Sequence, residues 1–285
     1  MIGATVQPRA PVKRLGLPVR LISALVLAPP VLAALYVGPP YSDILVIVAA
    51  GLAAWEWARL CGNGIVAVPG AVLIAAVLVT AVAGVLGLYS IAGWVIATGA
   101  MVAAVASMRT KLGTPLWYAA GAAYLGSAIL AFLWLRADPV TGRFIILWLI
   151  TVVWATDIGA YAAGRSIGGP RLAPGISPGK TWAGLAGGIL AAAAAGMAVL
   201  LGLEGDELGL VALVRMAAAS AVLAVVAQVG DLFESHLKRR TGVKDSSDLI
   251  PGHGGVLDRI DGLLAAALAL GCAIRLTGGI HLEWL

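Results

Sequence analysis

The chain has 285 residues, of which 61% are hydrophobic and 12% are charged, and its mean hydropathy is +0.98. A chain this apolar cannot fold as a water-soluble domain, and it lacks the strand-like alternation typical of a membrane β-barrel. Its formal net charge is +5, but no nucleic-acid recognition motif accompanies this charge, so we expect no nucleic-acid partner.

Nine apolar runs are long enough to be membrane-spanning helices. In chain order, these helices are expected at about 21–37, 43–60, 65–88, 91–107, 115–135, 144–164, 182–203, 211–232 and 256–277. The connections are short, so the sequence predicts an all-α, polytopic membrane helix bundle: a basic tail at 1–20 and a single transmembrane domain at 21–285. Pro29-Pro30 interrupts the first apolar run and no clear cleavage site follows, so we do not expect a cleaved signal peptide.

The basic residues predict the orientation of these helices, because lysine and arginine accumulate on the cytoplasmic side of a membrane. With the N-terminus inside and the C-terminus outside, nine helices place all but four of the 19 lysines and arginines on the inner side. A missed or extra helix in the middle of the chain would destroy this asymmetry. The sequence therefore predicts a multi-pass protein of the cell (cytoplasmic) membrane, N-in and C-out.

Two polar elements precede the eighth helix. Asp157 lies within the sixth span, where a carboxylate should face the bundle interior. The loop that follows contains Ser177-Pro178-Gly179-Lys180-Thr181. This loop is not a P-loop, because Pro174 stands where the P-loop pattern requires glycine and no strand precedes it. Anchoring to lipid head groups is one interpretation of this loop.

Residues 228–261, QVGDLFESHLKRRTGVKDSSDLIPGHGGVLDRID, contain nearly every ionisable residue type between two apolar segments. Charge in that position is costly and usually functional. Gln228, Asp231, Ser235 and Lys238 are spaced three, four and three residues apart, so they share one helical face. The alternatives for Asp231 are a metal ligand and an acid neutralised by a nearby lysine or arginine.

Asp258 and Asp261 stand one turn apart at the start of the ninth helix. Two carboxylates at this spacing can face one cation, and oxygen ligands favour Mg²⁺. The turn before them, Pro251-Gly252-His253-Gly254-Gly255, adjoins a helix N-terminus, which favours bound anions. Beside the basic residues that precede it, this turn is predicted to be a phosphate cradle. His253 is either a donor to phosphate or a purely structural histidine.

The spacing of this segment resembles the signature of the CDP-diacylglycerol synthase (phosphatidate cytidylyltransferase) family. Twelve positions carry the resemblance: Ser235, Lys238, Arg239, Lys244, Asp245, Pro251, His253, Gly254, Gly255, Asp258, Arg259 and Asp261. The Ser177–Thr181 loop and the surroundings of Asp157 also resemble elements of that family. A solvated basic loop that meets anionic lipid is the plainer alternative, but it requires neither His-Gly-Gly nor acids that extend into the next helix.

The resemblance implies an enzyme that converts CTP and phosphatidic acid to CDP-diacylglycerol and pyrophosphate, with its active site facing the cytoplasm. It implies Asp231 and Asp258 as ligands of Mg²⁺ and five catalytic residues: Asp231, Lys238, Arg239, Asp258 and Asp261. The residues expected to bind substrate are Asp157, Ser177, Lys180, Thr181, Ser235, Lys244, Asp245, His253, Gly254, Gly255 and Arg259. A second cation such as K⁺ and a homodimer are left open.

Three alternative functions are weighed against this one. A CTP-dependent enzyme acting on another lipid phosphate, or on a lipid alcohol, stays open. A CDP-alcohol phosphotransferase is excluded, because Ala265-Ala266 stands where its pattern requires Ala-Arg. A cation-coupled transporter is the non-enzyme alternative, but the ionisable residues gather at one membrane face rather than at the midplane, and no internal repeat is evident.

Overall fold

The structure is a computed structural model, and it describes residues 17–204 and 209–277. In these residues the chain forms helices with one short β-hairpin. The elements are α1 (Leu17–Val37), α2 (Tyr41–Cys61), α3 (Val68–Val85), α4 (Tyr89–Thr110), α5 (Pro115–Arg136), α6 (Gly142–Ser166), β1 (Arg171–Ala173), β2 (Ser177–Thr181), α7 (Trp182–Glu204), α8 (Leu210–Arg240) and α9 (Leu257–Leu276).

The nine helices predicted from hydropathy are present within residues 17–204 and 209–277, so that prediction is confirmed. In the described residues, seven of them are long and apolar enough to cross a membrane, so the protein is an integral membrane protein. The helix α9 is not among the seven, because Asp258, Arg259 and Asp261 lie at its start. The helix α1 begins at Leu17, inside the expected tail, and continues through Pro29 and Pro30.

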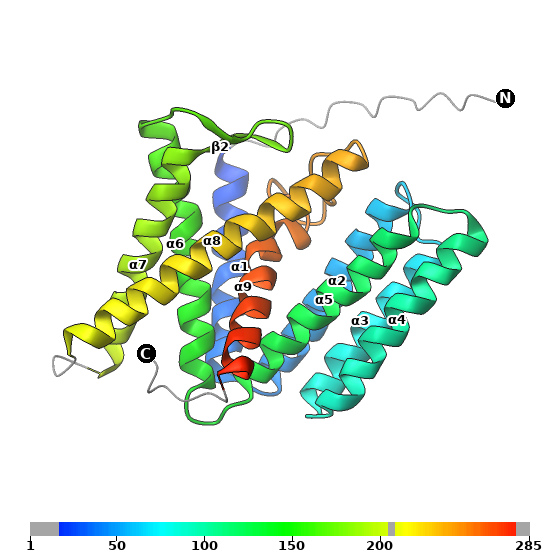
Figure 1. Ribbon diagram of the computed structural model, residues 1–285, viewed down its shortest axis with the longest axis horizontal. Coiled ribbons are helices and arrows are strands. Elements are labelled where there is room, and N and C mark those ends of the chain that lie inside the picture. The colour runs from blue at the N-terminus through cyan, green and yellow to red at the C-terminus, as the bar shows by residue number, and fades with distance from the viewer. Residues whose placement is uncertain (1–16, 205–208, 278–285) are drawn as a thin grey trace.

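The main difference from the prediction concerns α8, which extends past residue 232 to Arg240. Its 31 residues give a length of about 46 Å, against about 30 Å for the hydrocarbon core of a bilayer. The helix runs obliquely through the molecule (Figure 1). The polar residues of its last turns find partners on α9, so the helix does not end where the apolar run ends.

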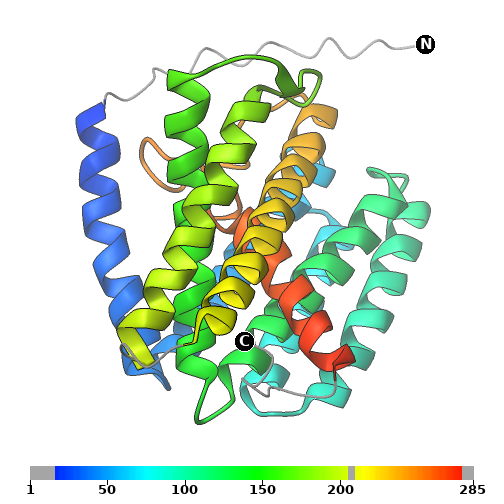
Figure 2. The same cartoon turned by 60° about the vertical axis from the view of Figure 1, so that its left-hand side comes forward.

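The helices form two groups on either side of α9. The helices α3, α4 and α5 pack together, with α2 against α3 and α5, whereas α6 packs against α7 and α7 against α8. The helix α9 contacts both α8 and α5 and lies between the groups (Figures 1 and 2). The start of α9 is therefore surrounded by elements from distant parts of the sequence.

Small residues bring α6 and α7 into direct backbone contact. A Cβ atom on Gly159 would lie 2.6 Å from the carbonyl oxygen of Gly187, so the two backbones leave no room for a side chain. Lipid tails are as apolar as the helices they surround, so helices in membranes associate through such close van der Waals packing. This contact fixes α6, which carries Asp157, against α7, which follows the hairpin.

An aromatic cluster joins α2, α5 and α8. The buried ring of Trp57 lies 5.9 Å from Phe233, 6.0 Å from Tyr124 and 6.5 Å from Trp117, measured between ring centroids. The Trp57 indole nitrogen also donates a hydrogen bond to the Trp117 carbonyl oxygen at 2.9 Å. The cluster sets the position of α8 relative to α2. Its central residue, Trp57, directly follows Glu56 in the sequence.

The segment between α6 and α7, expected to be a loop, forms an antiparallel hairpin. Arg171 pairs with Thr181 and Ala173 with Ser177. The hydroxyl oxygen of Thr181 accepts a hydrogen bond from the Gly184 backbone N–H at 3.0 Å, so Thr181 caps the N-terminus of α7. The hairpin lies at the same end of the bundle as the C-terminal turns of α8 (Figure 1).

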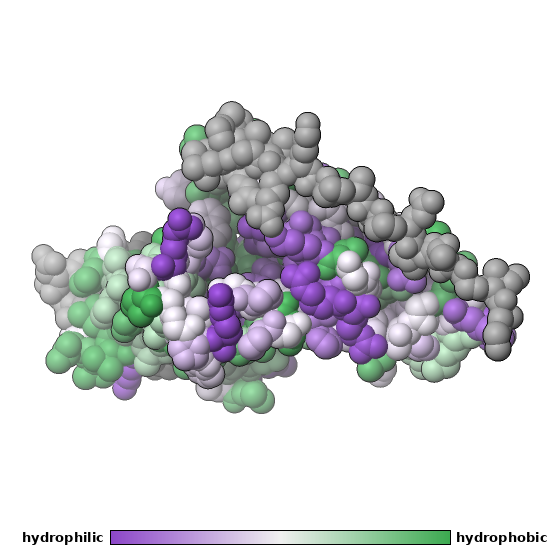
Figure 3. All heavy atoms as spheres, turned by 90° about the horizontal axis from the view of Figure 1, so that it is seen from above, coloured by the Kyte–Doolittle hydropathy of each residue, from purple (hydrophilic) through white to green (hydrophobic). Residues whose placement is uncertain are grey.

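Hydrophilic residues gather at the centre of that end, with hydrophobic residues towards its edges (Figure 3). The start of α1 and the end of α9 lie at opposite ends of the bundle (Figures 1 and 2). An odd number of crossings produces this arrangement. The N-in and C-out orientation stays a prediction.

This orientation can be tested with two reporter fusions. A reporter enzyme fused after Leu112, in the α4–α5 connection, is expected to be active only on the cytoplasmic side. The same reporter fused after Leu285 is expected to be active only outside, because five further helices lie between the two positions. Strong cytoplasmic activity of the Leu285 fusion would contradict the proposed orientation.

Candidate active site

Polar side chains from the hairpin and α8 meet at Asp231. Its Oδ2 atom lies 2.6 Å from the ammonium nitrogen of Lys180 on β2. One turn further along α8, the Ser235 hydroxyl donates a hydrogen bond to Asp231 Oδ1 at 3.2 Å. The shared helical face predicted from the spacing is therefore present for Asp231 and Ser235. Both alternatives for Asp231 stay relevant, because the acid is neutralised by a lysine yet keeps a partly exposed carboxylate, 32% accessible.

Two further carboxylates belong to the same electrostatic group. Asp157 on α6 is exposed, and the charges that act on it include Asp231, Lys180 and Arg259. The charges that act on Asp261 of α9 include Asp231 and Asp157. Three acids from α6, α8 and α9 thus act on one another, together with Lys180, Lys238 and Arg259, so the region combines acidic groups that could hold a cation with basic groups that could hold a phosphate.

Lys238 lies between two buried carboxylates rather than facing solvent. Its ammonium nitrogen is 2.5 Å from Glu234 Oε2, one turn earlier on α8, and 2.5 Å from Asp258 Oδ1 on α9. The three side chains are between 2% and 10% exposed. Sequence reasoning assigned Lys238 to phosphate and omitted Glu234, although a glutamate four residues before a lysine favours this pair. In the structure, Lys238 joins α8 to α9.

Asp258 is held by donors from its own loop. Its Oδ2 atom accepts hydrogen bonds from the Gly255 N–H at 2.7 Å, and from the Ser246 N–H and the Ser246 hydroxyl at 2.9 Å each. Gly254 has a φ of +88°, and a Cβ atom there would lie 2.7 Å from Asp258 Oδ2. These glycines therefore allow the turn to close around a carboxylate of the protein itself.

The turn predicted as a phosphate cradle uses its N–H groups internally. Besides the Gly255 bond to Asp258, the N–H groups of His253 and Gly254 donate to the Ile250 carbonyl oxygen at 2.9 and 3.1 Å. Nδ1 of His253 lies 2.7 Å from the Ser23 hydroxyl of α1. Phosphate binding by these N–H groups would require the internal bonds to break, so the cradle stays a prediction without geometric support.

Sequence reasoning left out Glu56, and the structure places it at the centre of this loop. The side chain is fully buried and accepts four hydrogen bonds, from the hydroxyls of Ser246 and Ser247 and from the backbone N–H groups of Val256 and Leu257. The signal was present, because a carboxylate in an apolar span marks a functional site by default.

The remaining predicted residues are less central to the cluster. Arg239 is exposed and donates through Nε to the Ile176 carbonyl oxygen of the hairpin at 3.1 Å. Thr181 caps α7 and is buried, so the hydroxyl predicted to bind substrate serves the fold. The others lie around the site: Ser177 is half-buried on β2, while Lys244, Asp245 and Arg259 are exposed.

The donor set fits a magnesium ion only in part. Within residues 17–204 and 209–277, no group of three His, Cys, Asp or Glu side chains is arranged to hold a metal ion by itself. Mg²⁺ is commonly bound by one or two carboxylates and shared with substrate phosphates, which the acids around Asp231 can provide. Both oxygens of Asp258 are engaged by donors of the protein, so binding of an ion there would require Lys238 to move, and the metal ligand at Asp258 stays a prediction. Asp261 and Asp157 are the other acids that share charge interactions with Asp231.

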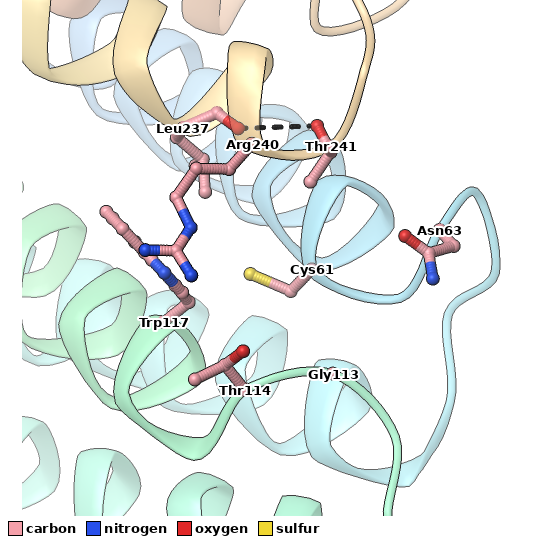
Figure 4. A pocket seen from close by; sticks show the side chains of 8 residues that line it. All are labelled: Cys61, Asn63, Gly113, Thr114, Trp117, Leu237, Arg240 and Thr241. Atoms are coloured by element: carbon pink, nitrogen blue, oxygen red, sulfur yellow. Dashed lines mark hydrogen bonds between the residues drawn. The ribbon is translucent and has the colours of Figure 1, made fainter.

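A separate pocket of about 170 Å³ opens on another face of α8. Leu237, Arg240 and Thr241 line it together with the end of α2 and the start of α5 (Figure 4). The Arg240 guanidinium carbon lies 5.3 Å from the centre of the Trp117 ring. None of the residues predicted to form the site lines this pocket.

Comparison with known proteins identifies the family to which this chain belongs. Residues 18–277, which include all the helices and the hairpin from Pro18 onward, match the cytidylyltransferase family. The chain belongs to the cytidylyltransferase family. The match covers every element that contributes to the carboxylate cluster, so the expected family is confirmed over the whole site.

Individual members of the cytidylyltransferase family support this assignment. The chain is 38% identical to the phosphatidate cytidylyltransferase of Pseudomonas aeruginosa over 260 residues, which cover 87% of this chain and 93% of that protein. It is 48% identical to the phosphatidate cytidylyltransferase of Brucella suis over 156 residues, 54% of this chain and 55% of the relative. The chain thus spans about half the length of the Brucella relatives that it matches.

The contacts of Lys238 predict a large effect on stability. Lys238→Met should lower the free energy of unfolding by about 3–5 kcal/mol, because it leaves Glu234 and Asp258 buried without a counter-charge. Arg239→Ala, at the neighbouring exposed position, should change it by less than about 1 kcal/mol. Unfolding of both purified variants in the same detergent measures the difference. Similar small losses for both would contradict the structural role of Lys238.

Proposed function

We propose that this protein transfers a cytidylyl group from CTP to phosphatidic acid and releases pyrophosphate. The observation that carries the proposal is the ion pair between Asp231 and Lys180, on which the charges of Asp157 and Asp261 also act, in a chain whose family match covers all four residues. Acidic and basic groups at the membrane edge suit a reaction between a water-soluble polyanion and a lipid phosphate. We propose that this end faces the cytoplasm.

In the proposed reaction, a phosphate oxygen of phosphatidic acid attacks the α-phosphorus of CTP. The new P–O bond joins the two phosphates as CDP-diacylglycerol, and the bond between the α-phosphorus and the bridging oxygen breaks. The electron pair of that bond leaves with pyrophosphate. The attacking oxygen is already largely ionised near neutral pH, so the reaction requires no strong general base. The main obstacle is repulsion between two anions.

The residues proposed to overcome this repulsion are Lys180, Arg239 and the acids around Asp231. Lys180 can turn from Asp231 towards a nucleotide phosphate, because the two groups are held by a single ion pair. Arg239 is exposed beside the hairpin and available to a phosphate oxygen. Lys238 and Asp258, being paired and buried, hold α8 and α9 in register. This proposed structural role of Lys238 and Asp258 differs from the sequence prediction, which assigned Lys238 to phosphate and Asp258 to the metal ion.

We propose that Asp231, with Asp261 or Asp157, holds Mg²⁺ at this site. When bound, the ion would supply positive charge to the phosphate oxygens. Asp157 is an exposed carboxylate within a membrane span, and such a group requires a polar partner or water. These carboxylates would hold the cation near the start of α9. A second cation such as K⁺ and a homodimer stay predictions.

The reaction can be tested with purified protein in detergent, labelled CTP and Mg²⁺. Phosphatidic acid should give equal amounts of labelled CDP-diacylglycerol and pyrophosphate. Diacylglycerol, offered instead, distinguishes an enzyme that acts on lipid alcohols, and another lipid phosphate tests the choice of acceptor. Absence of pyrophosphate with every lipid would contradict the proposal and favour a transporter.

Loss of the charge at Asp231 should stop this reaction without unfolding the protein. Asp231→Asn keeps the size of the side chain but weakens both the pair with Lys180 and any cation contact, so pyrophosphate release should fall about a hundredfold or more. The matched control is Asp138→Asn, in the α5–α6 loop at the other end of the bundle, where the acid accepts hydrogen bonds from Thr141. Equal activity of the two variants would exclude Asp231 as an essential residue.

A further inference from the structure

We propose that Glu56 of α2 is a positioning residue of this active site. It fixes the start of α9 and the preceding loop, and through Ser246 it sets the orientation of Asp258 and therefore of Lys238. The proposal rests on the proposed function for its kinetic consequences. Its structural content, the anchoring of residues 246–257 by Glu56, can be tested without any turnover.

The first argument is the saturation of the Glu56 carboxylate. Oε1 accepts from the Ser247 hydroxyl at 2.5 Å and the Val256 N–H at 2.9 Å, and Oε2 accepts from the Leu257 N–H at 2.6 Å and the Ser246 hydroxyl at 3.1 Å. A carboxylate offers about four acceptor positions; the Ser247 hydroxyl and two backbone N–H groups fill three, and the fourth faces the Ser246 hydroxyl, whose single proton is shared with Asp258. The side chain is 0% exposed, so water does not compete for these bonds.

The second argument is that Glu56 provides the cap that α9 lacks locally. Val256, at the N-cap position of α9, makes no capping hydrogen bond with its own side chain. The first N–H groups of a helix have no partner within the helix, and the N-terminus favours negative charge. Glu56 accepts from two of these N–H groups, although it lies 200 residues away in the sequence.

The third argument is the space reserved for this carboxylate. A Cβ atom at Gly255 would overlap both the Glu56 carboxylate and the Ser246 hydroxyl. Glycine at this position is therefore required by the close approach of Glu56, which explains the second glycine of the His-Gly-Gly turn. The first glycine, Gly254, is required by Asp258 in the same way.

The link from Glu56 to the site runs through a single hydroxyl group. Ser246 Oγ lies 3.1 Å from Glu56 Oε2 and 2.9 Å from Asp258 Oδ2, so its single proton is shared between the two acids and links them. The other carboxylate oxygen of Asp258 accepts from Lys238 at 2.5 Å. Ser247 also donates to Glu56, and its other hydrogen bond is with the backbone N–H of Leu249 rather than with Asp258. Substitution of each serine in turn therefore distinguishes two roles of Glu56. Positioning of Asp258 depends on Ser246, whereas anchoring of the loop involves both serines.

The first experiment compares Glu56→Gln with Asp43→Asn in purified full-length protein. Asp43 also lies on α2, but it pairs with Arg136 at the opposite end of the helix. Glu56→Gln should lower kcat about 10- to 100-fold with little change in KM for CTP, as is usual when an orienting partner is removed. It should also speed hydrogen exchange at the backbone amides of residues 246–257. Asp43→Asn should leave kcat and this exchange unchanged.

The second experiment compares Ser246→Ala with Ser247→Ala. This comparison tests the proposal even if the Glu56→Gln protein does not fold. Positioning through Asp258 predicts a larger fall in kcat for Ser246→Ala. It also predicts that Ser246→Ala and Glu56→Gln together cost less than the product of their separate effects. Equal kcat for the two serine variants, or a Glu56→Gln protein that loses thermal stability but keeps kcat, would overturn the positioning role.

The hydrogen-exchange measurement separates this proposal from the proposed function. If wild-type protein releases no pyrophosphate from CTP with any lipid phosphate, the proposed function fails. Faster exchange at residues 246–257 in Glu56→Gln would still support the anchoring by Glu56. Unchanged exchange in that variant would overturn the anchoring, whether or not the wild type is active.

Discussion

Burial of charge at the start of α9 is the constraint on which the rest of this structure depends. Lys238 lies between Glu234 and Asp258, while Glu56 and Asp258 accept hydrogen bonds from the loop that precedes the helix. In an apolar bundle each of these charges would be strongly destabilising without its partners. The partners come from α2, α8, the loop and α9, so they satisfy one another only when all four are correctly placed.

This constraint explains why α8 extends beyond its apolar segment. Its last turns carry Glu234 and Lys238 across to α9, and the ring of Phe233 packs against Trp57 beside Glu56. On the neighbouring face, Asp231 and Ser235 remain directed towards the hairpin. One helix therefore serves two purposes: one face stabilises the junction with α9, and the adjoining face presents the acid proposed to carry the reaction.

The two sets of acids differ in how completely they are satisfied. Asp258 and Glu56 have donors at every oxygen, which suits groups that hold a fixed geometry. Asp231 is balanced by the single ammonium group of Lys180, and Asp157 stays exposed. The second set has more acceptor capacity left for a cation or a substrate. The division matches the proposed split between the scaffold of the site and its reactive side, and it could not be read from residue type, because both sets consist of carboxylates.

The sequence by itself determined the membrane helices, the family and the end of the bundle at which the polar residues gather. Hydropathy sets helix length, and the spacing of Asp231 and Ser235 sets a shared face, since both depend on local geometry alone. Only the tertiary structure decided which charges are partners. It paired Lys238 with Asp258, made Thr181 a helix cap and brought Glu56 to a helix that begins 201 residues later. Partner choice depends on which helices meet, and that follows from packing across the whole chain rather than from any single segment.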